Sequence, residues 1–192
     1  MNEIEKAIKI IREGGIVIIP TDTAFGISCR IDDERAIKRL FEIRKRPFSQ
    51  ATPVLFDTVE KVKDFVYPFD SRIEDLMNKF WPGALTIVLK CDIALVSELV
   101  RGGGENLGVR IPDHKIPRKI VEEVGVPILG PSANFHGEKT PYKFEELDKS
   151  LIKLVDFIVE GKTKEENLAS TVIDCTQEPW KIIRQGNVKI DL

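Results

Sequence analysis

Four short segments of this chain carry side chains that can bind phosphate and a small polar acid. Three of them lie next to apolar runs and are rich in hydroxyl and amide groups: residues 20–23 (PTDT), 131–134 (PSAN) and 170–171 (ST). The fourth, residues 44–47 (RKRP), places three cations in a row. Guanidinium, hydroxyl and amide groups can hold phosphate and carboxylate groups without a metal. The segments therefore predict a polar, anion-binding site.

Each segment also has a purely structural interpretation. The side chains of residues 20–23 can bond their own backbone in a turn, and cations at the end of a helix complement its dipole. Ser132 or Asn134 can cap a helix, and Arg184 can be an ordinary surface charge. Taken singly, the segments leave both interpretations open, so the functional argument depends on their order along the chain.

The composition is typical of a globular protein. Of 192 residues, 42% are hydrophobic and 31% are charged, and the net charge of −2 gives the molecule no overall attraction to nucleic acid. No apolar run approaches the ~20 residues that cross a bilayer, and the charged N-terminus is unlike a signal peptide. We expect one domain over residues 1–192, a cytoplasmic location and no membrane partner.

The cysteines and histidines do not predict a metal centre. Cys29, Cys91 and Cys175 lie far apart, and only His114 and His136 are present to complete a zinc site. We therefore expect three reduced thiols and no structural metal.

Hydrophobic periodicity predicts an α/β fold that would position these segments. Residues 16–19 form a continuous β-branched run, typical of a strand buried on both faces. Helices are expected around residues 4–11, after an N-cap at residues 32–33, at 117–124 and at 142–150. Further strands are expected at 85–89, 107–111, 128–129, 154–159, 171–173 and 181–184. Because the strands cluster late in the chain, a mixed twisted sheet is favoured over a regular doubly wound one.

Taken together and in order, these segments resemble the threonylcarbamoyl-adenylate synthase family. The matching motifs span nearly the whole chain: residues 14–26 (GGIVIIPTDTAFG), 44–47 (RKRP), 81–86 (WPGALT), 108–112 (GVRIP), 131–134 (PSAN), 170–174 (STVID) and 184–186 (RQG). The resemblance implies a YrdC-like fold. That fold is a twisted mixed parallel/antiparallel sheet flanked by helices, with a concave cationic groove, here in the short single-domain form.

The resemblance also implies an activity. The family's enzymes are nucleotidyltransferases that join L-threonine, bicarbonate or CO2 and ATP into threonylcarbamoyl-AMP, with release of pyrophosphate. Mg2+ would accompany ATP. A separate tRNA threonylcarbamoyl transferase then moves the threonylcarbamoyl group to adenosine 37 of tRNA.

The resemblance implies roles for individual residues by position. Arg44 and Arg46 would be catalytic, through the phosphates. The residues implied to hold L-threonine are Thr23, Asp57, Arg110, Gly130 and Ser170. The residues implied to line the ATP site are Arg46, Thr52, Asn106, Ser132, Thr140 and Arg184. Arg110 would pair with the threonine carboxylate.

The chain departs from the family pattern at three places. Arg44 stands where the motif usually has lysine, and a planar guanidinium is not equivalent to a compact ammonium. Residues 47–53 are longer than the usual spacing by about two residues. Asp57 replaces a common histidine. These departures bear on the substrate more than on the fold.

Two other functions are therefore kept beside the synthase. One is a non-catalytic protein that binds tRNA or double-stranded RNA through a cationic surface. The other is a divergent paralogue that carbamoylates a different small molecule.

Overall fold

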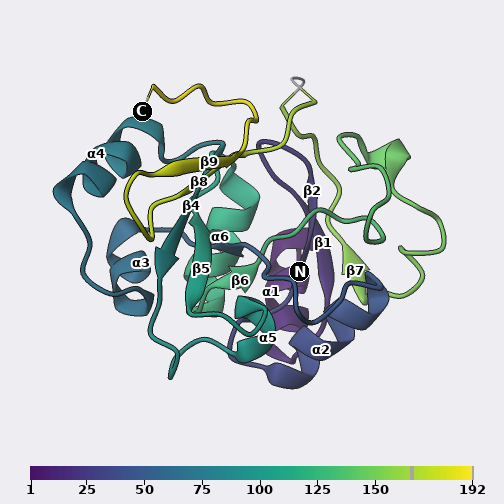
Figure 1. Ribbon diagram of the computed structural model, residues 1–192. Helices are drawn as coiled ribbons and strands as arrows, with labels where there is room; N and C mark the ends of the chain where they lie inside the picture. The colour runs from purple at the N-terminus through teal and green to yellow at the C-terminus, as the bar shows by residue number, and fades with distance from the viewer. Residues whose placement is uncertain (165–166, 192) are drawn as a thin grey trace.

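The computed structural model describes residues 1–164 and 167–191, and Figure 1 shows their arrangement. The helices are α1 (Glu3–Arg12), α2 (Glu34–Ile43), α3 (Val59–Phe65), α4 (Ser71–Phe80), α5 (Glu98–Arg101), α6 (Lys115–Val124) and the 3-10 helix η1 (Phe144–Glu146). The strands are β1 (Val17–Pro20), β2 (Phe25–Ser28), β3 (Val54–Leu55), β4 (Leu85–Lys90), β5 (Asn106–Arg110), β6 (Ile128–Leu129), β7 (Phe157–Ile158), β8 (Thr171–Asp174) and β9 (Lys181–Arg184).

The strands form two sheets in which parallel and antiparallel pairs are mixed. The larger sheet has the order β6-β3-β5-β4-β8-β9, and the smaller one has the order β2-β1-β7. β4 is antiparallel to β5 and parallel to β8, and β1 is antiparallel to β2 and parallel to β7. The predicted mixed sheet is thus confirmed. Isolated backbone pairs, Gly26 with Ser132 and Arg30 with Ile128, join the smaller sheet to the chain around β6.

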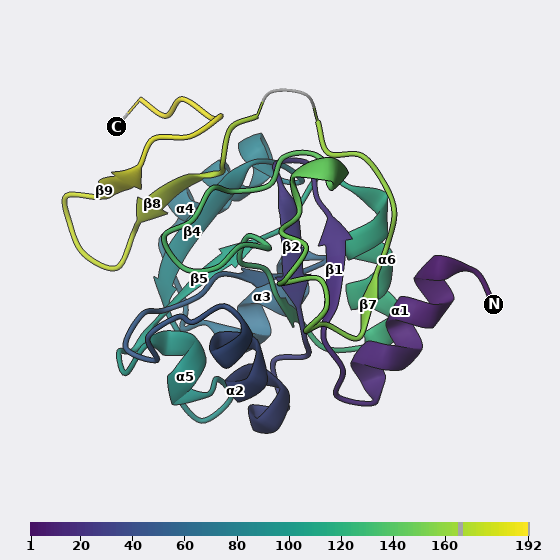
Figure 2. The same cartoon turned by 90° about the vertical axis from the view of Figure 1, so that its right-hand side faces the viewer.

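Strand β1 is buried on both faces, as its β-branched sequence predicts. Ile16 and Ile18 belong to the larger core cluster, which extends into the six-stranded sheet. Val17 and Ile19 point the other way, into a smaller cluster formed largely by the apolar faces of α1 and α6. Figure 2 shows these two helices side by side against β1. The strand end at Pro20 is consequently held rigidly from both sides.

Helix α2 ends in a turn that redirects the three-cation segment. The Asp33 side chain caps its N-terminus, as expected, by accepting from the backbone of Arg35 and Ala36. At its other end, the Arg46 backbone N–H donates to the Phe41 carbonyl at 2.9 Å, while Lys45 has a positive φ of 52°. This is the Schellman arrangement, with lysine at the position where glycine is usual.

The prediction of a helix at residues 142–150 is wrong, because only the short η1 forms there. The Glu146 carboxylate accepts from the backbone N–H groups of Tyr142 and Lys143, and the Asp148 carboxylate accepts from those of Ser150 and Leu151. These local side-chain bonds replace the backbone bonds that a continuous helix needs.

Side chains that would indicate other chemistry are dispersed. All three cysteines are free, and burial raises the pKa of the Cys29 thiol, with a smaller contribution from Asp33. Over residues 1–164 and 167–191, no three His, Cys, Asp or Glu side chains gather closely enough to hold a metal ion. Within the same residues, no helix has the length and hydropathy needed to cross a membrane.

Candidate functional site

A cavity of about 170 Å³ lies where the two sheets meet, and four arginines line it. Its walls come from the turn after β1, the end of α2, strands β3, β4 and β5, the loop after β6, and the β8–β9 pair. We call it the arginine cavity. The predicted site residues that line it are Thr23, Arg44, Arg46, Arg110, Gly130, Ser132, Thr140, Ser170 and Arg184.

Arg44 is the most deeply buried of the three consecutive cations. Its guanidinium donates from Nε to the Asn134 carbonyl at 3.0 Å and from Nη2 to the Asn134 Oδ1 at 3.3 Å. Its Nη1 is buried and has no hydrogen-bond partner among the residues that the structure describes. Burial lowers the pKa of Arg44 to about 10, and the nearby charge of Arg46 contributes to the shift. Arg44 therefore retains an unused donor in a place where its charge is poorly solvated.

Arg46 reaches the same cavity through the turn at Lys45. Its Nε and Nη2 donate to the backbone carbonyls of Gln50, at 3.3 Å, and Ala51, at 2.6 Å. Burial lowers the pKa of Arg46 as well. These two carbonyls belong to the segment 47–53, which therefore helps to orient this guanidinium.

Arg184 is positioned by the pairing of β9 with β8. It donates from Nε to the Ser170 carbonyl and from Nη2 to the Ser170 hydroxyl, both at 3.0 Å. The same hydroxyl lies 2.9 Å from that of Thr86 on β4. Burial is the main cause of the lowered pKa of Arg184, and the charge of Arg110 adds to it. Two segments distant in sequence thus form one wall of the cavity.

Arg110 differs from the other three because a carboxylate neutralises it. Its Nη2 donates to the Asp22 Oδ1 at 2.6 Å, its Nη1 to the Thr23 hydroxyl at 2.9 Å, and its Nε to the Gly83 carbonyl at 2.9 Å. The two side chains of the ion pair are nearly inaccessible, at 7% for Arg110 and 3% for Asp22. The end of β5 and the turn after β1 are thereby locked together.

The electrostatics of the arginine cavity favour an anionic ligand. No described carboxylate forms an ion pair with Arg44, Arg46 or Arg184, and the described lining contains neither Asp nor Glu. Burial without a countercharge disfavours the charged form of a cation, which is why the pKa values of these three arginines are lowered. A bound anion would supply the missing countercharge.

The loop after β6 brings backbone close to the cavity. A side chain at Gly130 would place its Cβ 2.4 Å from the Leu55 side chain, so glycine is required for this close approach. The Ser132 hydroxyl donates to the Asn134 Oδ1 at 2.6 Å, and the Asn134 amide donates to the Glu138 carbonyl at 2.7 Å. The polar side chains of this loop therefore support each other and Arg44, and they do not cap a described helix.

Three predicted residues are not among those that line the arginine cavity. Asp57 faces two neighbouring hollows beside Arg118, and its Oδ2 accepts from the Lys61 ammonium at 2.7 Å. Thr52 is 2% exposed, and its hydroxyl has no hydrogen-bond partner in the described part of the chain. Asn106 begins β5 opposite Lys90. It lies about 13 Å along the strand from Arg110, because a strand advances roughly 3.3 Å per residue.

The structure also shows contributors that are not among the predicted site residues. Asp22 and Asn134 hold Arg110 and Arg44, and Thr86 supports Ser170. All three lie inside motifs recognised from the sequence. A polar side chain near the end of a strand is the signal that could have identified each of them. Their partners could not be predicted in the same way, because these lie far away in the chain.

A family model described as Telomere recombination, for the Sua5, YciO and YrdC proteins, matches residues 9–186. The threonylcarbamoyl-AMP synthase of Bacillus subtilis (strain 168) is 31% identical over 186 residues, which cover 97% of this chain and 54% of that protein. The chain thus spans about half the length of the first curated relatives it matches.

Solved structures agree with this relationship. The crystal structure of Pyrococcus abyssi Sua5 complexed with L-threonine has a TM-score of 0.91 and 33% identity, covering 95% of this chain and 54% of that one. The crystal structure of Escherichia coli YciO has a TM-score of 0.84 and 27% identity, covering 95% of this chain and 88% of that one. With a family match over residues 9–186, the chain belongs to the Sua5/YciO/YrdC family.

Proposed function

We propose that this protein is a nucleotidyltransferase that makes L-threonylcarbamoyl-AMP from L-threonine, bicarbonate or CO2 and ATP, with release of pyrophosphate. The observation that carries the proposal is the composition of the arginine cavity. Three of its arginines have no carboxylate partner among the described residues, and the fourth, Arg110, pairs with Asp22. Relatives named threonylcarbamoyl-AMP synthase and the crystal structure of Sua5 complexed with L-threonine support the choice of substrates.

In this proposal, L-threonine binds at the end of the cavity that holds Arg110. The guanidinium receives the substrate carboxylate, and Thr23 and Ser170 offer hydroxyl groups. The close approach of backbone at Gly130 provides a wall without a side chain. Asp57 and its ion pair with Lys61 lie outside this arrangement.

ATP then occupies the end that holds Arg46 and Arg184, with Ser132 and Thr140 beside it. The unpartnered Nη1 of Arg44 is available to an oxygen of the triphosphate or of the one-carbon substrate. Thr52 and Asn106 are not assigned to the nucleotide, because neither lines the cavity.

The reaction requires no covalent enzyme intermediate. The threonine amine attacks CO2 and loses a proton, which gives a carbamate; with bicarbonate, that proton leaves as part of the water that is eliminated. A carbamate oxygen then attacks the α-phosphorus of ATP, and the bond to pyrophosphate breaks. The cavity contributes by aligning the reacting groups and by neutralising the phosphate charge. The poorly solvated guanidinium groups are suited to that role because they are already desolvated.

Mg2+ is proposed to arrive with ATP. Phosphate oxygens and water are the ligands that Mg2+ commonly keeps when a protein binds a nucleotide. The described lining of the arginine cavity offers hydroxyl groups and no carboxylate, so it fits a metal held mainly by the nucleotide. Bound in that way, the metal would neutralise part of the charge on the leaving pyrophosphate.

The product is a reactive mixed anhydride, so an acceptor must follow. We propose that a separate tRNA threonylcarbamoyl transferase uses it to modify adenosine 37 of tRNA, and that both steps take place in the cytoplasm.

The test is pyrophosphate release from ATP and bicarbonate in the presence of each amino acid in turn, with mass spectrometry of the nucleotide product. The proposal expects release that depends on L-threonine, and a product with the mass of threonylcarbamoyl-AMP. Release with another amino acid only would identify a paralogue of different specificity. No release, combined with tight, salt-sensitive RNA binding, would favour an RNA-binding protein.

A further inference from the structure

We propose that Asp22 makes the Arg110 end of the arginine cavity selective for a zwitterionic amino acid over a simple anion. The inference rests on the proposed function and names a specificity-determining residue for it. Asp22 does not line the described cavity wall, so its role is to position and neutralise Arg110 from behind.

The ion pair of Asp22 with Arg110 is unlike every other ion pair of the described residues. Both of its side chains are more than nine-tenths buried. The next most buried pair, Asp57 with Lys61, leaves the lysine 32% exposed. A buried ion pair gives little net stability compared with apolar residues of the same size. Stability alone is therefore a weak explanation for placing this pair beside a ligand cavity.

The hydrogen bonds of Arg110 leave room for one more partner. A guanidinium has five N–H groups. Three of them are used by Asp22, Thr23 and Gly83, one from each nitrogen. One N–H therefore remains on Nη1 and one on Nη2, which is the number that a carboxylate accepts in a bidentate contact. Asp22 fixes the plane of the guanidinium without exhausting its donors.

The charge at this end is balanced, in contrast to the rest of the cavity. Arg44, Arg46 and Arg184 have no carboxylate partner among the described residues, whereas Arg110 has Asp22 at 2.6 Å. An anion bound at Arg110 is attracted by the guanidinium and repelled by the carboxylate behind it. For a zwitterion this repulsion is offset, because its ammonium group is attracted by the same carboxylate.

The four arginines that line the cavity consequently differ in charge balance. Phosphates are favoured at the three unpaired arginines, and the amino acid is favoured at the Asp22–Arg110 pair. This difference disfavours a phosphate group at Arg110 and favours an amino acid there.

The experiment is calorimetric titration without ATP, using L-threonine, 3-hydroxybutyrate, which lacks the amine, and threoninol, which lacks the carboxylate. For the wild-type protein we expect threonine to bind at least tenfold more tightly than either analogue. In Asp22→Asn, we expect the Kd for threonine to rise at least tenfold and the Kd for 3-hydroxybutyrate to fall, because Arg110 becomes an unbalanced cation. The control is Asp32→Asn, which removes an exposed partner of Arg30 and should change neither Kd.

The outcomes separate this inference from the proposed function. Equal binding of threonine and 3-hydroxybutyrate to the wild-type protein would overturn the inference and leave the synthase proposal standing. An equal loss of affinity for both ligands in Asp22→Asn would show a merely structural role. The wild-type comparison decides even if the variant does not fold, and no measurable threonine binding at all would overturn both proposals.

Discussion

Arg44 and Asn134 are 90 residues apart in the chain and are joined by two hydrogen bonds, from Nε to the carbonyl at 3.0 Å and from Nη2 to Oδ1 at 3.3 Å. The contact ties the end of α2 to the loop after β6. In return, the His136 backbone N–H donates to the Arg44 carbonyl at 2.7 Å. The motifs at 44–47 and 131–134 therefore form one structural unit.

Replacing Arg46 tests the anion-binding end of the arginine cavity. Arg46→Ala should weaken ATP binding by about 10- to 100-fold, because a hydrogen bond to a charged group contributes roughly 1.5–3 kcal/mol. The melting temperature should change little, because the loss of two hydrogen bonds is offset by the removal of a partly buried cation that pairs with no described carboxylate. Calorimetry and thermal unfolding measure the two effects. Arg35→Ala, which removes an exposed arginine of α2, is the control and should leave ATP binding unchanged.

Arg110→Lys tests the amino-acid end. Lysine keeps the charge that Asp22 requires but cannot reproduce the planar fork that Asp22, Thr23 and Gly83 hold. We expect the KM for threonine to rise by about tenfold or more, as for the loss of one charge-assisted bond, while the KM for ATP changes little. Asp57→Asn should leave the threonine KM as in the wild type, because Asp57 pairs with Lys61 outside the cavity. If Asp57→Asn raised the threonine KM more than Arg110→Lys did, the amino-acid site would lie beside Asp57 and not beside Arg110.

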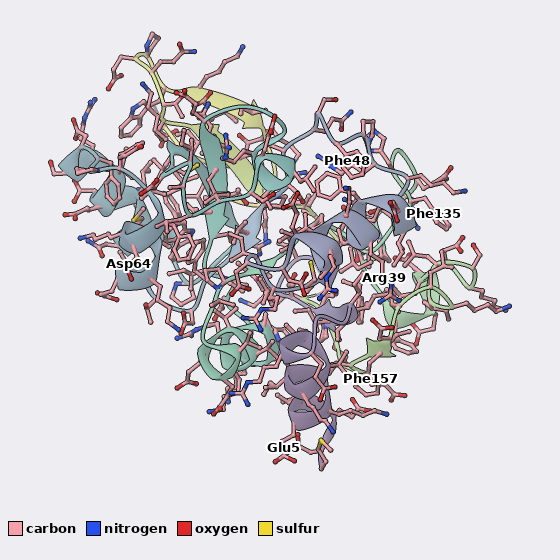
Figure 3. All side chains as sticks on the ribbon, turned by 90° about the horizontal axis from the view of Figure 1, so that it is seen from below. Glu5, Arg39, Phe48, Asp64, Phe135 and Phe157 are labelled. Carbon is pink, nitrogen blue, oxygen red and sulfur yellow. The ribbon has the colours of Figure 1, made fainter. Side chains whose placement is uncertain are left out.

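Lys45→Gly should stabilise the protein. Lys45 has a φ of 52°, a left-handed conformation that costs a non-glycine residue about 1 kcal/mol. Its ammonium lies 4.7 Å from the Phe135 ring centre, an exposed contact that contributes roughly 0.5 kcal/mol. Figure 3 shows Phe48 and Phe135 at the same end of α2.

Chemical denaturation of Lys45→Gly and Lys45→Ala separates these two contributions. Glycine relieves the backbone conformation, whereas alanine keeps it and loses the ring contact. The expected order of stability is glycine variant, wild type, alanine variant. If the alanine variant is as stable as the glycine variant, the backbone conformation is not the source of the gain.

His114 gives the stability a dependence on pH. Its Nδ1 accepts from the Ile116 backbone N–H as the N-cap of α6, and its Nε2 donates to the Lys162 carbonyl. Burial lowers the pKa of His114, outweighing the opposing effects of that hydrogen bond and of Asp22 and Asp113. The folded protein thus binds this proton less readily than the unfolded chain does, so stability is complete above the unfolded pKa of about 6.5 and falls as the pH drops below it.

Denaturation between pH 7 and pH 5 measures this loss in the variants His114→Asn and His136→Asn. Asparagine is a good N-cap and does not titrate in this range, so His114→Asn should lose less stability on acidification than the wild type. His136 is exposed, and its replacement should leave the wild-type pH dependence in place. Identical profiles for all three proteins would show that His114 does not cause the effect.

The sequence predicts local structure well where apolar periodicity and caps agree. The strand at residues 16–19, the helix after Asp33 and the helix at 117–124 all appear, at β1, α2 and α6. The helix prediction at residues 142–150 fails because acidic side chains accept hydrogen bonds from backbone N–H groups that a helix would use. The four-residue α5 was not foreseen, because so short an element has no periodicity to detect.

The candidate site is predictable as a set of motifs but not as a set of contacts. The order of the motifs identified most of the residues that line the arginine cavity. The resemblance assigns Asp57 to the substrate by position alone. In the structure its carboxylate pairs with Lys61, four residues later, outside the arginine cavity. The pairing of Asp22 with Arg110 joins residues 88 apart in the chain, which no local pattern encodes.

If the four arginines share one ligand site, a crystal structure with L-threonine and a non-hydrolysable ATP analogue will show both ligands there. We predict the threonine carboxylate against the Arg110 guanidinium and the triphosphate against Arg46 and Arg184, in one continuous cavity. Threonine or the triphosphate bound on another face of the molecule, with these guanidinium groups left without a ligand, would contradict it.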